Sequence, residues 1–395
     1  MARSKSLFYL GLTLALLPAL LRYYLTWPLP GSQELDSIHW VYSLEKSMPW
    51  TAAVGLLMAA VGLIGLVRQR PARKTLVWVG IACVVAVCLY GVTIKYAAPS
   101  MFGPVPEARF ARGTTDELPP ETLVMGITSG SQAKAYPIRL LAYHHRVDDE
   151  LNGDPIWVTY CTMCRTGKIF RPIVDGRQLE LDLVGAVRYN SFYRDRATGT
   201  YWYQANGRAV VGPMTGSVLP ELRSDQMTLA NWLELYPDSE VMQPDPASSE
   251  GYKLFSFDKI DEVRSKTDNP PGWQWVVGIV HDGTARGYPW AELATTRLIQ
   301  DQLGELPLAI QLHSDGVSQR VWDRRLDGRV LDLELVPEGD QLFDATSGST
   351  FGFDGVAVDG ELAGQSLQAV PASVEFRHSF ETFSGSDIYQ AGLGA

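Results

Sequence analysis

Several features that signal a familiar chemistry are missing from this sequence. It contains no Gly-rich phosphate loop, no nucleophile elbow and no helical motif with paired histidines. Basic residues are in the minority, because 34 Lys and Arg stand against 44 Asp and Glu, which gives a formal net charge of -10. A nucleic-acid surface needs clustered Lys and Arg, and here they alternate with acids, so nucleic-acid binding is excluded. The sequence favours a non-catalytic protein and assigns no catalytic or cofactor-binding residue.

Cysteine is also rare, with four copies in 395 residues. Cys83 and Cys88 lie in one apolar run, and a separation of five places them about 140° apart on a helix, so they cannot face one ligand. The other two belong to the segment Tyr160-Cys161-Thr162-Met163-Cys164-Arg165-Thr166-Gly167, which lies between two runs typical of strands. This Cys-x-x-Cys is where chemistry is expected.

Long apolar runs are present only near the N-terminus. Residues 7–21, 50–67 and 75–94 each approach the about 20 residues that a membrane-spanning helix needs, and the first run can extend to Trp27. A cleaved signal peptide is the alternative for the first run, but no small-x-small cleavage site follows it. The sequence therefore predicts three spanning helices.

The basic residues around these runs predict their orientation. Arg3 and Lys5 precede the first run, and residues 68–74 between the second and third carry four basic side chains, including Arg70. The positive-inside rule places both segments in the cytoplasm, so the chain leaves the third span on the outer side. We predict a multi-pass protein of the inner (cytoplasmic) membrane, with the lipid bilayer as a partner and the soluble part on the periplasmic side.

The segments that flank the spans have their own patterns. Residues 33–46 could form a short amphipathic helix on the outer membrane surface, with Ser32 as its cap. Residues 97–120 read as an extended linker because they are rich in proline: Pro99, Pro104, Pro106, Pro119 and Pro120.

Beyond residue 120 the pattern is that of a β protein. Short runs of β-branched and aromatic residues are separated by turn residues such as Asn152-Gly153 and Asp175-Gly176. One helix is predicted at 228–235, where Pro237 ends it. The strands are predicted at 123–127, 133–137, 156–160, 168–170, 179–183 and 201–203.

An internal repeat organises this β region. Gly126-Ile127 and residues 133–137 recur in the same order and at the same spacing as Gly278-Ile279 and residues 285–289. Asp195, Thr198, Gly199 and Trp202 recur as Asp344, Ser347, Gly348 and Phe351, and Gly207, Gly212 and Gly216 recur as Gly355, Gly360 and Gly364. Such ordered coincidences predict a tandem duplication of a β unit of about 120 residues.

The predicted fold is therefore mainly β. Three N-terminal transmembrane helices (1–96) and the Pro-rich linker (97–120) precede two tandem β units in an all-β extracytoplasmic domain. The first unit (121–245) carries the Cys-x-x-Cys, and the second (246–395) is a degenerate copy. Pro155 aligns with Pro307, and this register places His313 opposite Cys161 and Gly316 opposite Cys164.

The Cys-x-x-Cys has four interpretations. A thioredoxin-like site is disfavoured, because a helix should follow the cysteines, and here the sequence predicts a turn into a strand, with Gly167 letting the chain bend. A pair on a tight hairpin can hold a metal, and zinc, or copper as Cu(I) with Met163 or Met125, would need one or two histidines in addition. The alternatives are a disulfide or redox pair, since an outer compartment is oxidising, and simple reduced packing.

Several motifs around this pair fall in a familiar order. They are His144-x-x-Val147-Asp148-Asp149, Asn152-Gly153-x-Pro155, Val158-Thr159-Tyr160-Cys161-x-x-Cys164-x-Thr166-Gly167, Asp195-x-x-Thr198-x-Thr200-x-Trp202 and Gly207-x-Ala209-x-x-Gly212. Over roughly residues 123–241 the chain resembles the domain-of-unknown-function family numbered 3179, which is typically extracytoplasmic. The resemblance implies that His144 accompanies Cys161 and Cys164 as a metal ligand. Arg165 departs from it, because Gly or a small polar residue is common there.

Two functions remain open from the sequence, ahead of a third, an enzyme acting on a small molecule between the two copies, which ranks below them because no nucleophile–base pair is visible. The first is a membrane-anchored extracytoplasmic metal-binding or redox-associated protein centred on Cys161 and Cys164. The alternative is a non-catalytic structural or accessory subunit of a larger membrane complex, such as one for electron transfer, with other membrane-protein subunits as partners. The sequence contains no assigned catalytic residue that would favour one of these functions over another.

Overall fold

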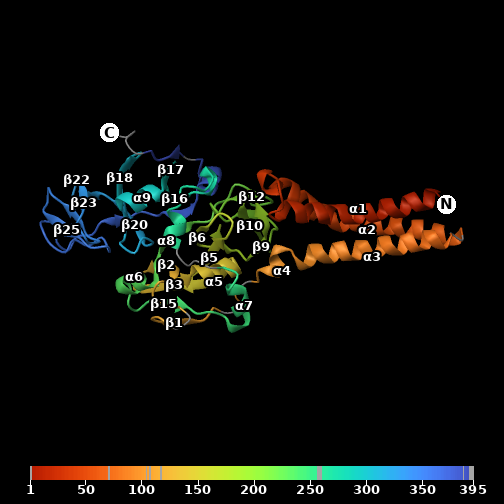
Figure 1. Cartoon of the computed structure of the whole chain (residues 1–395), viewed down its shortest axis with the longest axis horizontal. Coiled ribbons are helices and arrows are strands. Elements are labelled where there is room, and N and C mark those ends of the chain that lie inside the picture. Colours follow the sequence, from red (N-terminus) through yellow and green to blue (C-terminus); the bar gives the residue numbers. More distant parts are fainter. Residues whose placement is uncertain are drawn as a thin grey trace. The chain divides into compact units, whose positions relative to one another are not determined.

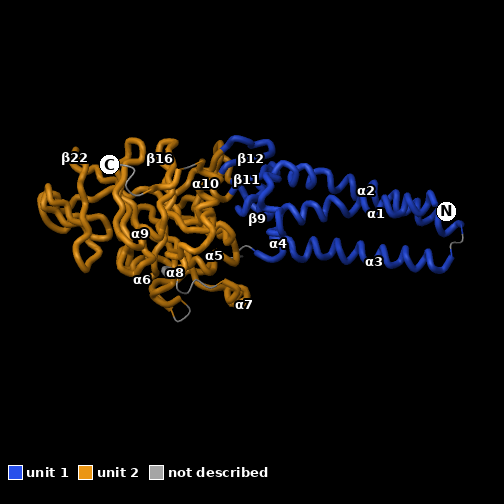
Figure 2. The backbone as a smooth tube through the Cα atoms, turned by 45° about the horizontal axis from the view of Figure 1, so that its top comes forward, with its two compact units in different colours: residues 1–103, 179–203, 208–217 blue, residues 104–178, 204–207, 218–395 orange. Residues whose placement is uncertain are grey.

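A computed structural model of the chain describes residues 2–69, 72–103, 105, 108–115, 118–255, 260–385 and 387–390. Arg70 of the predicted cytoplasmic link and Pro104 and Pro106 of the predicted linker lie outside these residues. The chain divides into two compact units, coloured in Figure 2. The first unit comprises residues 1–103, 179–203 and 208–217, and the second comprises residues 104–178, 204–207 and 218–395. The predicted boundaries at 96, 120 and 245 follow chain order rather than compactness and stay predictions.

The first unit contains three long helices, α1 (Ala2–Thr26), α2 (Ile38–Arg68) and α3 (Arg73–Lys95). Each is long and apolar enough to cross a membrane, which confirms the three predicted spans. Figure 1 shows them side by side. Glycine lets α1 and α2 approach closely, because a Cβ on Gly11 would lie 2.4 Å from the Ala59 nitrogen and one on Gly62 would lie 2.5 Å from the Phe8 nitrogen.

The predicted surface helix at 33–46 is wrong. Residues Ser32–Glu34 form only a 3-10 turn (η1), which ends where Leu35 adopts an extended conformation. Helix α2 then begins at Ile38 and continues through Pro49 into the span. Ser32 does not cap a helix, because its hydroxyl donates to the carbonyl oxygens of Trp27 (2.6 Å) and Leu29 (2.8 Å).

A four-stranded antiparallel sheet completes the first unit, in the order β12-β11-β10-β9. It is joined to the segment between α1 and α2, because Gln33 Nε2 donates to the Ala186 carbonyl oxygen at 3.2 Å. The absence of a side chain on Gly185 makes room for Thr26, whose Cβ lies 2.7 Å from where a Cβ would be. The short helix α4 (Ala98–Met101) also contacts this sheet. Its strands are β9 (Leu181–Val187), β10 (Asn190–Asp195), β11 (Tyr201–Tyr203) and β12 (Ala209–Val211).

The second unit begins with a set of strands that we call the first strand group. Its two sheets have the orders β1-β15-β3-β2-β14 and β13-β6-β5-β4. The core between them is apolar and includes Tyr136, Leu141 and Val158. The strands are β1 (Phe110–Arg112), β2 (Leu123–Ser129), β3 (Gln132–Pro137), β4 (Arg146–Leu151), β5 (Asp154–Cys161), β6 (Thr166–Phe170), β13 (Glu221–Leu222), β14 (Asp225–Thr228) and β15 (Glu240–Met242), with helices α5 (Ile138–His144) and α6 (Leu229–Leu235).

The predicted strands and the predicted helix of this region are confirmed within a few residues. Helix α6 follows Thr228, whose hydroxyl caps it by accepting from the Asn231 nitrogen. The acidic residues 148–150 form part of β4. Asp149 is held there by Lys134 Nζ (2.9 Å) and Tyr136 Oη (2.6 Å), which both donate to its carboxylate.

A second strand group follows, with sheets ordered β27-β16-β17-β28 and β18-β19-β20-β26. Its strands are β16 (Trp275–His281), β17 (Thr284–Pro289), β18 (Leu298–Leu303), β19 (Leu306–Leu312), β20 (Gln319–Asp323), β26 (Gln368–Ala369), β27 (Ser373–Phe376) and β28 (Asp387–Ile388), with helices α9 (Trp290–Thr296) and α10 (Arg377–Ser384). A three-stranded sheet joins β23 (Leu333–Leu335), β24 (Leu342–Asp344) and β25 (Ser349–Phe351).

The remaining elements are short connections. They are β7 (Ile173–Val174), β8 (Arg177–Gln178), β21 (Arg325–Leu326), β22 (Arg329–Val330), η2 (Pro246–Ser248), α7 (Ser249–Tyr252), α8 (Ile260–Arg264) and η3 (Pro271–Trp273).

The two strand groups share local contacts as well as strand order. Arg286 Nη1 (2.6 Å) and Tyr288 Oη (2.8 Å) donate to Asp301, as Lys134 and Tyr136 do to Asp149. The residue that follows α5, His145, has φ 62°, and the residue that follows α9, Arg297, has φ 58°.

A glycine holds the same place in each group. A Cβ on Gly126 would lie 2.2 Å from the Trp232 ring, and one on Gly278 would lie 2.4 Å from the Phe380 ring. We expect Gly126→Ala to lower the thermal midpoint of the full chain in detergent, followed by circular dichroism, by the equivalent of about 1–3 kcal/mol of overpacking.

Gly339→Ala is the matched control, because the nearest atom to its new Cβ would be 3.8 Å away, at the Val336 oxygen. Equal midpoints for both variants would contradict the close packing of β2 against α6.

Candidate functional site

The Cys-x-x-Cys forms the turn of the β5–β6 hairpin. Cys161 is the last residue of β5 and faces Thr166, the first of β6. Arg165 closes the turn with φ 59°, in the left-handed region that costs a side chain about 1–2 kcal/mol. This strain explains why Gly or a small polar residue is expected there from the family resemblance. The predicted turn into a strand is confirmed.

Gly167 has a different role from the predicted one. It lies within β6 rather than in the turn. A Cβ there would lie 2.9 Å from the Met125 sulfur and 3.2 Å from Gln226 Nε2. The glycine therefore lets two neighbouring side chains pack onto the strand, and the bend belongs to Arg165.

The two thiols lie close together in the interior. Cys161 and Cys164 form no disulfide, and both have 0% of their surface exposed. Burial raises the pKa of the Cys164 thiol well above its ordinary value, and a hydrogen bond with Cys161 adds to the rise. The Cys164 thiol is therefore protonated at neutral pH, which makes it a poor nucleophile in this state.

Side chains of the second strand group fix this turn. Thr166 Oγ1 donates to Glu375 Oε2 at 2.9 Å and lies 3.2 Å from Ser379 Oγ. Ser373 Oγ donates to the other oxygen of Glu375 at 2.6 Å, and the Phe376 nitrogen donates to the Cys164 carbonyl oxygen at 3.0 Å. The Glu375 carboxylate, 3% exposed, is thus supplied with donors from both groups.

The second strand group has a turn that is held in a reciprocal way. His313, the residue aligned with Cys161, lies between β19 and β20 and forms a hydrogen bond of 3.0 Å with Asn231 Nδ2. Asn231 Nδ2 also donates to Asp315 (2.9 Å), and the Thr228 nitrogen donates to Ser318 Oγ (3.0 Å). The β5–β6 turn is therefore hydrogen-bonded to the β27–α10 junction of the second group, and the β19–β20 turn is hydrogen-bonded to the β14–α6 junction of the first.

A buried arginine lies beside the first turn. Arg264 is 1% exposed, its Nη2 donates to Gln226 Oε1 at 3.1 Å, and its guanidinium lies over the rings of Trp275 (4.9 Å) and Trp290 (4.8 Å). Its Nε and Nη1 have no hydrogen-bond partner among the described residues. Burial lowers the pKa of Arg264 to about 10 and raises that of Tyr160 to about 12.

Only two of the three predicted metal ligands are brought together by the structure. The structure brings Cys161 and Cys164 together, whereas His144 ends α5 and forms a hydrogen bond of 2.8 Å with Tyr252 Oη. Among the residues that the structure describes, no three His, Cys, Asp or Glu side chains gather at a spacing that holds a metal ion. The metal site of Cys161, Cys164 and His144, with zinc or copper, stays a prediction.

The hairpin, its paired thiols and its flanking motifs coincide with one family profile, which matches residues 99–386. The chain belongs to the family described as protein of unknown function (DUF3179). The match covers both strand groups, so the DUF3179 region is wider than the resemblance seen from residues 123–241. No curated protein and no solved structure matches the chain.

Sequence reasoning missed the residues that seat the turn of this DUF3179 protein. Glu375 and Ser379 lie far from Cys161 in the chain, and only the pairing of the two strand groups brings them to Thr166. Arg264 lies in a short helix between the groups that no periodicity indicates. The one available signal was Thr166 itself, which belongs to the quoted motif.

His145, which is buried next to the end of α5, makes the stability of the second unit depend on pH. Burial lowers its pKa to about 4. The unfolded chain binds a proton at His145 below pH 6.5 and the folded chain only below about 4, so stability falls as the pH falls through this window, by up to about 3 kcal/mol.

We expect His145→Asn, which tolerates the left-handed backbone, to remove this part of the acid sensitivity. Thermal midpoints of both proteins measured from pH 7 to pH 4 test it. Parallel curves for the wild type and the variant would show that His145 is not the group responsible.

Proposed function

We propose that this chain is a redox-associated protein anchored in the inner membrane, with its soluble part on the periplasmic side. Its Cys161 and Cys164 interconvert between two thiols and a disulfide. The observation that carries the proposal is the pair itself: two cysteines that form no disulfide lie in one buried hairpin turn. The outer compartment expected from the charge pattern is oxidising, which supports a disulfide at such a spacing.

The reaction balances as a two-electron couple. Each thiol loses a proton and an electron as the sulfur–sulfur bond forms. The electrons pass to a disulfide of a thiol–disulfide exchange partner, which takes up two protons and becomes two thiols. The partner is named by this chemistry alone.

Burial decides how fast this couple can react. Because burial raises the pKa of the Cys164 thiol, few thiolates form at neutral pH, and both sulfurs are shielded from a large partner. Exchange therefore requires the turn to move away from the second strand group, which breaks the hydrogen bonds of Thr166 with Glu375 and Ser379. This favours a slow switch over a catalytic oxidoreductase, in line with the absence of a recognisable catalytic set.

Copper as Cu(I) is the second candidate, and one observation favours it. The Met125 sulfur lies beside Gly167, next to the strand pair that carries the cysteines. Two thiolates and a thioether are soft donors that suit Cu(I). A tetrahedral zinc site would need two further ligands beyond the cysteines. The accessory-subunit alternative stays a prediction.

We also propose that the two strand groups are copies of one ancestral unit. Their sheets have matching strand orders, and the Lys134–Tyr136–Asp149 contacts recur as Arg286–Tyr288–Asp301. The reciprocal seating of the two turns fits a pair of equivalent halves. The second copy then carries His313 where the first carries Cys161.

The thiol couple is tested by differential alkylation of the full chain, acid-quenched and unfolded, followed by peptide mass spectrometry. After exposure to oxidised glutathione we expect Cys161 and Cys164 to be labelled only after reduction, and Cys161→Ser to make Cys164 labelled without it. Cys83→Ser is the matched control and should leave the pair unchanged.

Two outcomes would redirect the proposal. Complete labelling of Cys161 and Cys164 without reductant would overturn the redox couple. Stoichiometric copper in the purified protein that is lost in Cys161→Ser would favour the second candidate.

The proposed orientation is tested by a reporter that is active only outside the cytoplasm, such as alkaline phosphatase. Fused to the C-terminus it should be active, and fused within the link between α2 and α3 it should be inactive, because that link carries the basic residues. The reverse pattern would place the DUF3179 region in the cytoplasm.

A further inference from the structure

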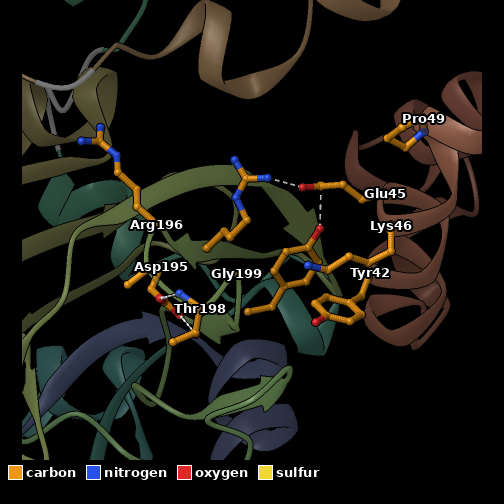
Figure 3. Close-up of a pocket in the computed structure, with 11 residues that line it drawn as sticks. Tyr42, Glu45, Lys46, Pro49, Asp195, Arg196, Thr198 and Gly199 are labelled. Atoms are coloured by element: carbon orange, nitrogen blue, oxygen red, sulfur yellow. Dashed lines mark hydrogen bonds and ion pairs between the residues drawn. The ribbon is translucent and has the colours of Figure 1, made fainter.

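The first unit contains a cavity of about 460 Å³ between α2 and the β10–β11 hairpin. The four residues that α2 contributes have the spacing of one helix face, and Figure 3 shows them on the side of the helix that meets the hairpin. They are Tyr42, Glu45, Lys46 and Pro49. The hairpin supplies the opposite wall, including Arg194 and Arg196.

The two acidic side chains of this cavity already accept hydrogen bonds from neighbouring residues. Glu45 accepts hydrogen bonds from Arg22 (3.2 Å), Arg194 and Tyr201 Oη (2.6 Å). Asp195 accepts from the nitrogen and the hydroxyl of Thr198, both at 2.6 Å, within its own turn. Neither carboxylate is left to bind a cation from solution.

The cations of the cavity are less completely paired. Lys46 forms no hydrogen bond or ion pair within the described residues, and its Nζ lies 5.3 Å from the centre of the Tyr42 ring. The same atom lies 3.4 Å from where a Cβ on Gly199 would be, so the ammonium group reaches the hairpin wall. Arg196 binds Asp182 and Glu180 but keeps 56% of its side chain exposed. Three cationic side chains and two acidic ones line the cavity, and Lys46 is the cation that is not paired with a carboxylate within the described residues.

The position of Lys46 along α2 sets its depth in the membrane. Large exposed apolar side chains become frequent along the helix from Trp50, which is 76% exposed and is followed by Val54 and Leu57, whereas Trp40 (60% exposed) lies nearer the start of the helix. Trp50 lies about 6 Å further along the helix than Lys46. The headgroup layer is about 5–7 Å thick on each side of the hydrocarbon core, and Trp is enriched at that boundary. Lys46 is thus placed at the level of lipid phosphates.

We propose that this cavity binds a phosphate-bearing anionic group at headgroup depth, with Lys46 as its direct ligand and Arg194 and Arg196 supplying positive potential. The shared chemistry is the phosphate, which can come from an anionic lipid or from a soluble molecule. This site involves no cysteine and does not depend on the proposed redox couple.

Native mass spectrometry of the full chain in detergent, titrated with phosphatidylglycerol and separately with phosphatidylcholine, tests the site. We expect preferential retention of phosphatidylglycerol, and roughly fivefold weaker retention in Lys46→Gln, as expected for loss of one cation near a lipid surface. Lys95→Gln is the matched control: Lys95 also lies over a tyrosine, Tyr96 at 5.5 Å, but does not line the cavity.

Competition with inorganic phosphate distinguishes the two sources. Displacement of the bound lipid by millimolar phosphate would support the site and assign it to soluble phosphates, and no displacement would assign it to the lipid headgroup. Equal loss in Lys46→Gln and Lys95→Gln, or equal retention of the two lipids without competition by phosphate, would overturn the proposal. Circular dichroism melts of both variants show whether the fold is retained.

Discussion

One buried carboxylate, that of Glu375, joins the two strand groups of the second unit. A carboxylate removed from water is costly unless hydrogen-bond donors replace the solvent. Glu375 receives one donor from Thr166 of the first strand group and another from Ser373 of its own. Neither group supplies the full set alone, so the charge is tolerated only where the two groups meet. The hairpin turn of Cys161 and Cys164 is consequently fixed from outside its own sheet.

The reciprocal turn shows that this seat can be built from other residues. His313, Asp315 and Ser318 join Asn231 and Thr228 by hydrogen bonds, where the first turn has two thiols and a threonine. Polar groups therefore suffice to hold a turn against a strand–helix junction. Thiols are not needed for that purpose, which is why their presence in one turn invites a chemical explanation.

The sequence predicts those elements whose formation depends on residues close to one another in the chain. Strands such as β2, β5 and β11 are set by runs of β-branched and aromatic residues, and α6 is set by the Thr228 cap, so all were predictable. The contacts of Asp149 in β4 were not predictable, because its partners, Lys134 and Tyr136, lie on β3 in the other sheet. The thiol pair was predictable from its spacing. Its seat was not, because Glu375 and Arg264 reach it only through tertiary packing.

The sheet β9–β12 belongs to the same compact unit as the spanning helices, although much of the second unit is encoded between them. This has a consequence for biosynthesis. Thr26 and Gln33 are made early, but their partners Gly185 and Ala186 are made only after the first six strands of the second unit's first group, β1 to β6, have been synthesised. The helices must therefore be inserted while the cap that completes their unit is still absent. The first unit is complete only once residue 217 of 395 has been made, well after its three helices.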